Sequence, residues 1–129
     1  MLDHLDLNVS DLERSRTFYE PLLEQLGYRA FESGSGWCSF IDAPGGFYLV
    51  LVQTSSEHAA SGFHRKRIGV NHLAFTMPSP ASVEALHGWL IEAGIPALYE
   101  GAMQMGDRTA VFVEDPDRMK LEFVFRPTA

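Results

Sequence analysis

The sequence predicts an α+β fold built from two βαβββ modules, and two observations support this. A short segment of alternating character, residues 2–9, recurs as residues 69–77 about half a chain later, with a histidine in each copy, His4 and His72. Each copy is followed by a helical pattern that starts at a serine and ends at a glycine, and then by three strand-like segments. Self-similarity of this length indicates one duplicated module and not an array of many short repeats.

The first module is expected over about residues 1–53. Residues 2–9 alternate between a polar and an apolar face, as in a half-buried strand. Ser10 and Glu13 have the spacing of a capping box, Gly27 ends the helix, and Pro21 predicts a kink or a break within it. The remaining segments are three predicted strands at residues 28–32, 37–41 and 47–53, which are separated by glycine-rich turns.

The second module is expected over about residues 69–126, after a polar linker or flap at 54–68. Its helix begins at Ser79, with Pro80 in the first turn, and ends at Gly94. Strands are predicted at residues 70–77, 95–100, 109–113 and 119–125, with a loop at 101–108. Together the modules form one domain over residues 1–129, and because neither half is expected to be stable alone, the two should pair within one chain or between chains.

Composition excludes several functions. A net charge of −7 argues against a nucleic-acid partner, and the basic run His64–Arg67 is predicted to be a solvated loop or, alternatively, a clamp for an acidic substrate. Cys38 is the only cysteine and lies in an apolar run, which indicates a buried, inert thiol in a reducing compartment. No apolar run approaches the roughly 18 residues of a membrane span, so we expect a soluble cytoplasmic protein without a membrane partner.

Aligning the last strands of the two modules on their turns places Glu122 in register with Val50. Glu122 shares a strand face with Lys120 and Val124, while the alternate residues are apolar and suit packing against a helix. The face away from the helices therefore offers His4, His72 and Glu122. Two imidazoles and one carboxylate form the ligand set of an open divalent-metal site, although each residue alone is more often structural.

The modules resemble those of the vicinal oxygen chelate superfamily, which includes glyoxalase I, bleomycin and fosfomycin resistance proteins, and extradiol dioxygenases. The matching stretches are His4–Ser15, Phe18–Leu23, Leu26–Tyr28, Val70–Phe75 and Phe112–Glu122. The resemblance implies curved mixed sheets around a metal pocket, with His4, His72 and Glu122 at three of the four family ligand positions. It also implies a site built within one chain or across a dimer, and we expect a homodimer.

The fourth ligand position carries Val50, where glyoxalase I-like enzymes carry a carboxylate. An isopropyl group neither binds a metal nor relays a proton, which disfavours a true glyoxalase I reaction and leaves extradiol-type dioxygenase chemistry open. The segment 99–108 lacks the lysine- and serine-rich signature of fosfomycin thiol transferases, and the acidic Asp6 on the pocket face suits a phosphonate poorly.

The sequence therefore predicts an enzyme that uses Fe, Zn, Ni or Mn as a Lewis acid on a small oxygen-chelating substrate. The alternative is a metal-free protein that sequesters a drug or metabolite, as bleomycin-binding relatives do. Substrate contacts are predicted for Trp37 and Tyr48, with Phe40 and Val52 as further cavity candidates, and for Met103 and Met105 as an apolar cover. His58 and His64 are candidate lid residues, and Lys120 is expected to point outward at an edge.

Overall fold

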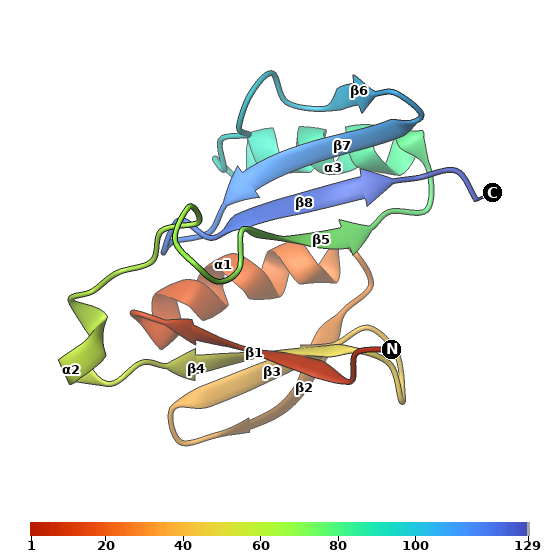
Figure 1. The fold of residues 1–129 in the computed structure, drawn as a ribbon. Coiled ribbons are helices and arrows are strands. Elements are labelled where there is room, and N and C mark those ends of the chain that lie inside the picture. The colour runs from red at the N-terminus through yellow and green to blue at the C-terminus, as the bar shows by residue number, and fades with distance from the viewer. Residues whose placement is uncertain (129) are drawn as a thin grey trace. The chain divides into compact units, whose positions relative to one another are not determined.

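The computed structural model describes residues 1–128, which form two compact units, Met1–Gly62 and the part from Phe63 onward (Figure 1). Each unit contains a strand, a helix and three further strands in that order, and each has its own four-stranded mixed sheet. The α+β fold of paired βαβββ modules that the sequence predicted is thus confirmed.

In the first unit, β1 (His4–Val9) pairs in parallel with β4 (Tyr48–Gln53). The strands β3 (Trp37–Ile41) and β2 (Arg29–Gly34) follow β4 as antiparallel neighbours, which gives the order β1-β4-β3-β2. The helix α1 (Leu12–Glu24) packs on one face of this sheet. The buried core between them consists of Val9, Tyr19, Leu22, Leu23, Phe40, Leu49 and Leu51.

The beginning and the interior of α1 differ from the prediction. Asp11, not Ser10, is the N-cap, because its carboxylate accepts the Arg14 backbone N–H at 3.1 Å. The helix is continuous through Pro21, so the expected break is absent. Pro21 has no N–H to donate to the Thr17 carbonyl. Because Pro21 lies on the exposed side of the helix, water can hydrogen-bond to that carbonyl instead.

In the second unit, β5 (His72–Thr76) pairs in parallel with β8 (Lys120–Phe125). The strands β7 (Arg108–Glu114) and β6 (Met103–Met105) complete the antiparallel part of the order β5-β8-β7-β6. The helix α3 (Pro80–Glu92) covers one face and begins in a capping box at Ser79, as predicted. The core of this unit includes the buried side chains of Phe75, Val83, Leu86, Leu90, Val111, Val113, Leu121 and Phe123.

The predicted strand at residues 95–100 is wrong, because only Ala97 in that segment forms a bridge, to Val113. Tyr99 and Gly101 adopt positive φ angles of 58° and 89°, which turn the chain and are incompatible with an extended strand. The strand forms instead at β6, inside the predicted loop. The predicted linker at 54–68 contains a short helix, α2 (Ser56–Ala59).

Among the described residues, no helix combines the length and the apolar character that crossing a membrane would require.

Candidate functional site

His72 and Glu122 meet on the face of the second sheet that α3 leaves uncovered. The register sets His72 opposite Lys120 and Ala74 opposite Glu122 on the neighbouring strands β5 and β8. His72 Nε2 lies 3.0 Å from Glu122 Oε2. Glu122 is only 7% exposed, and a carboxylate buried to this degree needs a cation or a hydrogen-bond donor. The polar atom that approaches it is His72 Nε2, so the sheet brings two of the three predicted metal ligands together.

Asn71 fixes the orientation of the His72 ring. The Asn71 side-chain oxygen lies 2.7 Å from His72 Nδ1, and its Nδ2 group donates to the Arg65 carbonyl at 3.5 Å. Because an amide oxygen only accepts, Nδ1 carries the proton and Nε2 faces the carboxylate. Nε2 and Glu122 then need a positive species between them, which a proton or a divalent ion can provide. The donor chemistry of this pair fits a metal ion.

His4 has a similar environment in the first unit. Its Nδ1 lies 2.6 Å from Asp3 Oδ2, and its Nε2 lies 3.6 Å from Asp6 Oδ1. The ring stacks on Tyr48, with 4.7 Å between centroids and 12° between planes. An Asp or Asn directly before each histidine therefore holds Nδ1 in both units. Sequence reasoning missed this role, although Asp3-His4 and Asn71-His72 stand at matching places in the repeat.

The strand registers agree with the predicted match between Val50 and Glu122. Val50 lies opposite Asp6 in the first sheet, just as Glu122 lies opposite Ala74 in the second. Each unit therefore has one carboxylate at this cross-strand pair, on β1 in one case and on β8 in the other. Within residues 1–128, no cluster of three or more His, Cys, Asp or Glu side chains forms a ready metal site. The three-residue set of His4, His72 and Glu122 stays a prediction.

The first unit contains an open cavity of about 380 Å³ on the face away from α1. This volume is within the range of about 300–1,000 Å³ that is typical of small-molecule sites. The predicted residues Trp37, Tyr48 and Val52 line it, together with His4, Asp6, Glu32, Ser39 and Val50. Phe40 does not, because it points to the opposite face and is 2% exposed in the core.

The phenol of Tyr48 lies on the cavity wall near several carboxylates. Burial raises the pKa of Tyr48 above its usual value of 10.0, and the nearby carboxylates of Asp3, Glu32 and Asp6 raise it further. A tyrosine phenol is protonated at neutral pH even at its usual pKa, so Tyr48 is a hydrogen-bond donor on the cavity wall.

Lys120 lies on the same sheet face as Glu122, on an interior strand, and the expectation that it points outward at an edge is wrong. Its ammonium is 2.6 Å from the Tyr99 hydroxyl and 4.7 Å from the centroid of the Phe112 ring. The Phe112 ring also meets the His72 ring edge-on. Sequence patterns did not point to Tyr99, because its contact depends on the left-handed backbone at this residue.

Met103 and Met105 lie in β6 and not in a covering loop. Both pack with Leu98 against the apolar cluster of Ala110, Phe112 and Val124, which belongs to the helix-free face of the second sheet. His58 is exposed in α2, 3.6 Å from Glu57, and His64 lies in the basic segment after Phe63. The structure therefore places the two methionines beside the His72–Glu122 face, and the role of the two loop histidines as lid residues stays a prediction.

The sequence profile of the Glyoxalase/Bleomycin resistance protein/Dioxygenase superfamily matches residues 1–123. The chain belongs to this superfamily. It is 40% identical to the uncharacterised protein YqjT of Bacillus subtilis (strain 168), over 95% of this chain and 97% of that protein. A superfamily of this breadth includes enzymes such as glyoxalases and dioxygenases, many of which use divalent metals.

Solved structures of other superfamily proteins share the fold. A candidate glyoxalase from Bacillus halodurans superposes with a TM-score of 0.88 at 41% identity, over 97% of this chain and 95% of that one. The fosfomycin resistance protein FosX from Listeria monocytogenes superposes with a TM-score of 0.72 at 19% identity, over 98% of this chain and 93% of that one. The second similarity concerns the fold alone.

Proposed function

We propose that this superfamily member is a divalent-metal-dependent enzyme whose small substrate presents two neighbouring oxygens. The observation that carries the proposal is the His72–Glu122 pair at 3.0 Å, with His72 oriented by Asn71. A neutral imidazole and a carboxylate that converge in this way form two positions of an open metal site. We propose His4 as the third ligand, because its Nδ1 is held in the same way at the matching place of the repeat.

A bound ion would supply Lewis-acid stabilisation of negative charge that develops on substrate oxygens. Side chains of the protein would supply the other contacts with the substrate. Lys120 and the Tyr99 hydroxyl present hydrogen-bond donors on the face that carries Glu122, where they can hold an anionic substrate oxygen. The neighbouring apolar cluster with Met103 and Met105 suits a hydrophobic substrate part. Val50 offers no proton-relaying carboxylate, which favours extradiol-type dioxygenase chemistry over the glyoxalase I reaction.

Metal binding tests the proposal directly. Elemental analysis of the purified chain should find about one divalent ion per chain, as expected for an open three-ligand site. Calorimetric titration of the chelator-treated protein with Zn²⁺, Ni²⁺, Mn²⁺ and Fe²⁺ should show a loss of roughly 100-fold or more in affinity for His72→Ala and Glu122→Gln, because each removes a direct ligand. His58→Ala, which removes an exposed histidine, is the matched control. Equal affinity in all four proteins would rule the site out.

The second candidate function is metal-free sequestration of an aromatic drug or metabolite, and the cavity lined by Trp37 and Tyr48 favours it. An aromatic ligand in this cavity should quench the fluorescence of Trp37. Binding measured by calorimetry that persists with chelator and in His72→Ala, but is lost in a Trp37→Ala, Tyr48→Ala variant, would support sequestration. Binding that requires the metal would support the enzyme.

We also propose that the chain forms a homodimer. Large apolar side chains, among them Leu2, Ile68 and Val70, are exposed on the single chain. Sedimentation equilibrium at micromolar concentration should give twice the chain mass of 14.4 kDa.

A further inference from the structure

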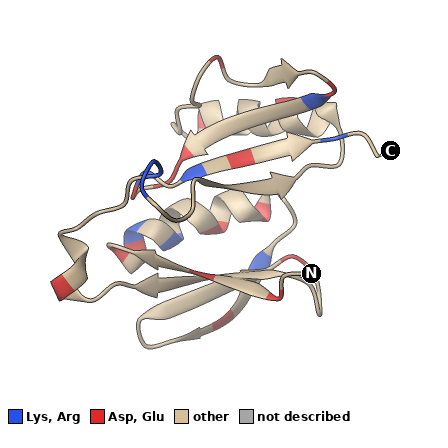
Figure 2. Ribbon diagram, viewed as in Figure 1, with Lys and Arg blue, Asp and Glu red and all other residues tan. Residues whose placement is uncertain are grey.

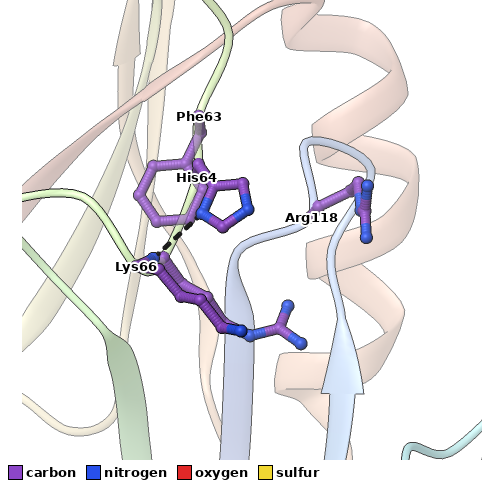
Figure 3. A pocket seen from close by; sticks show the side chains of 5 residues that line it. Phe63, His64, Lys66 and Arg118 are labelled. Carbon is purple, nitrogen blue, oxygen red and sulfur yellow. Dashed lines mark hydrogen bonds between the residues drawn. The ribbon is translucent and has the colours of Figure 1, made fainter.

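The second unit contains a small cavity whose walls are basic and which the proposed function does not use. Its volume is about 190 Å³, and it is lined by Phe63, His64, Arg65, Lys66 and Arg118 (Figure 3). Figure 3 shows His64 and Lys66 on one side of the cavity and Arg118 on the turn across from them. None of these five residues is acidic, although the chain as a whole carries a net charge of −7. Figure 2 shows the loop before β5 in blue, the colour of Lys and Arg.

The arginines on this cavity are held in place by one carboxylate. Glu114 Oε2 accepts from Arg65 at 2.8 Å and from Arg118 Nε at 3.4 Å. Arg118 has a positive φ of 68°, which a non-glycine residue adopts only when its surroundings impose it. The Asp115 carboxylate imposes it here by accepting the backbone N–H groups of Asp117 and Met119, both at 2.8 Å. The turn therefore presents Arg118 in a defined position.

The cavity wall consists mainly of donors. His64 Nδ1 accepts the backbone N–H of Lys66 at 3.1 Å, so the neutral ring carries its proton on Nε2 as a further donor. Arg65, Lys66 and Arg118 bring three positive charges to the lining, and the carboxylate of Glu114 pairs with both arginines. Within residues 1–128, no ion pair involves the Lys66 ammonium. The Lys66 ammonium is thus available to an anion.

We propose that this cavity binds a phosphate dianion, either free phosphate or the phosphate group of a small metabolite. Two guanidinium groups, an ammonium and an imidazole N–H match the several acceptor oxygens of a phosphate better than the two of a carboxylate. The volume is below the range of about 300–1,000 Å³ typical of sites for whole drug-sized ligands, which suits a single phosphate group.

The cavity adjoins the sheet face of His72 but does not share its ligands. Glu114 pairs across the strands with Lys120, which in turn lies opposite His72. Two strand spacings, about 10 Å, therefore separate the Glu114 and His72 positions. The Arg65 carbonyl accepts from the same Asn71 amide that orients His72. A phosphorylated substrate could be anchored here, yet phosphate binding itself does not depend on the proposed metal site.

The test is calorimetric titration of the full chain, in buffer with a chelator, with inorganic phosphate and with glycerol 3-phosphate. Lys66→Ala and Arg118→Ala should each weaken binding by about tenfold, the usual effect of losing one charge-assisted hydrogen bond. Arg29→Ala removes the same charge from an exposed site in the first unit and should bind as the unaltered chain does. His72→Ala should also bind normally, which separates this site from the metal site.

Equal affinity for the two ligands would identify free phosphate as the occupant, and tighter binding of glycerol 3-phosphate would identify a phosphorylated metabolite. Either result supports the proposal. The proposal would be overturned by absence of binding at millimolar concentration. It would also be overturned if neither Lys66→Ala nor Arg118→Ala weakened binding more than Arg29→Ala does.

Discussion

At the scale of single residues, the two histidines differ in their neighbours and agree in how they are held. In each case a side-chain oxygen of the preceding residue lies close to Nδ1, that of Asp3 at 2.6 Å and that of Asn71 at 2.7 Å. Each then directs Nε2 toward a carboxylate. Orientation of a ligand histidine through its second nitrogen is a common requirement of metal sites. The residue before each histidine is therefore part of the candidate site.

Asn71→Ala should weaken metal binding about 10- to 100-fold without removing a ligand, because loss of an orienting partner typically has that effect. Titration of the metal-free variant with Zn²⁺ gives the affinity. Asn71→Asp, which keeps an oxygen acceptor at the same place, should bind nearly as the unaltered chain does. Identical affinities for Asn71→Ala and the unaltered chain would show that His72 needs no such support.

Cys38 is buried, as expected, and its thiol should be unreactive in the folded chain. Burial raises the pKa of this thiol above its ordinary value, with the carboxylates of Glu20 and Glu13 adding to the effect against the opposing Arg16. At pH 8, iodoacetamide should therefore modify Cys38 far more slowly in the native protein than in urea, because the thiolate is the nucleophile. Equal rates would mean that the thiol is accessible.

The raised pKa of Cys38 also makes the free energy of unfolding depend on pH. The folded state holds the thiol proton more tightly than the unfolded state does. The stabilisation is therefore complete below the unfolded pKa of about 8.5 and decreases as the pH rises above it. Cys38→Ala should remove this part of the pH dependence, as measured by urea unfolding between pH 7 and 10.

At the scale of elements, sequence patterns located most strands and both long helices, because each has a strong period and a clear end signal. The failures have local causes. Asp11 competes with Ser10 for the same capping role, and the position of Pro21 on the exposed side is a tertiary property. The place of β6 depends on the left-handed turns at Tyr99 and Gly101, which apolar alternation at 95–100 does not reveal.

Ser15 in α1 is fully buried, and its hydroxyl has no hydrogen-bond partner among the described residues. Ser15→Ala should raise the free energy of unfolding by about 1 kcal/mol, because it removes an unsatisfied polar group and favours the helix. Ser82→Ala is the matched control, for which the free energy of unfolding should change in the opposite direction. The Ser82 hydroxyl completes the capping box of α3, so its removal should cost about 1 kcal/mol. Urea unfolding measures both, and a destabilised Ser15→Ala would show that its hydroxyl is satisfied by water.

At the scale of the whole molecule, duplication is what made the candidate site partly predictable. Aligning the modules was enough to single out His72 and Glu122, which the second sheet brings into contact. The orienting role of Asn71 and the Lys120–Tyr99 contact were out of reach, since they depend on side-chain geometry and on one unusual φ angle. The duplicated modules have also diverged, because the cross-strand carboxylate is Asp6 in one and Glu122 in the other.

From this divergence we infer that Asp6 disfavours an acidic residue at Val50. Val50 is buried on the cavity wall directly opposite Asp6, whereas Glu122 faces the small, uncharged Ala74. Val50→Glu would set two carboxylates against each other across β1 and β4. It should lower the free energy of unfolding by about 2 kcal/mol in the metal-free chain, since a buried charge is costly and like charges across strands repel.

If the carboxylates of Asp6 and Val50→Glu repel each other, removing one of the two charges should restore stability. Val50→Gln adds a polar side chain of similar size without charge and should destabilise the chain less than Val50→Glu does. Adding Asp6→Asn to Val50→Glu should recover most of the difference, because it removes the opposing charge. Urea unfolding in the presence of a chelator measures all three variants. If Val50→Glu and Val50→Gln were equally stable, Asp6 would not be the reason for an apolar residue at this position, and the valine would need a different explanation.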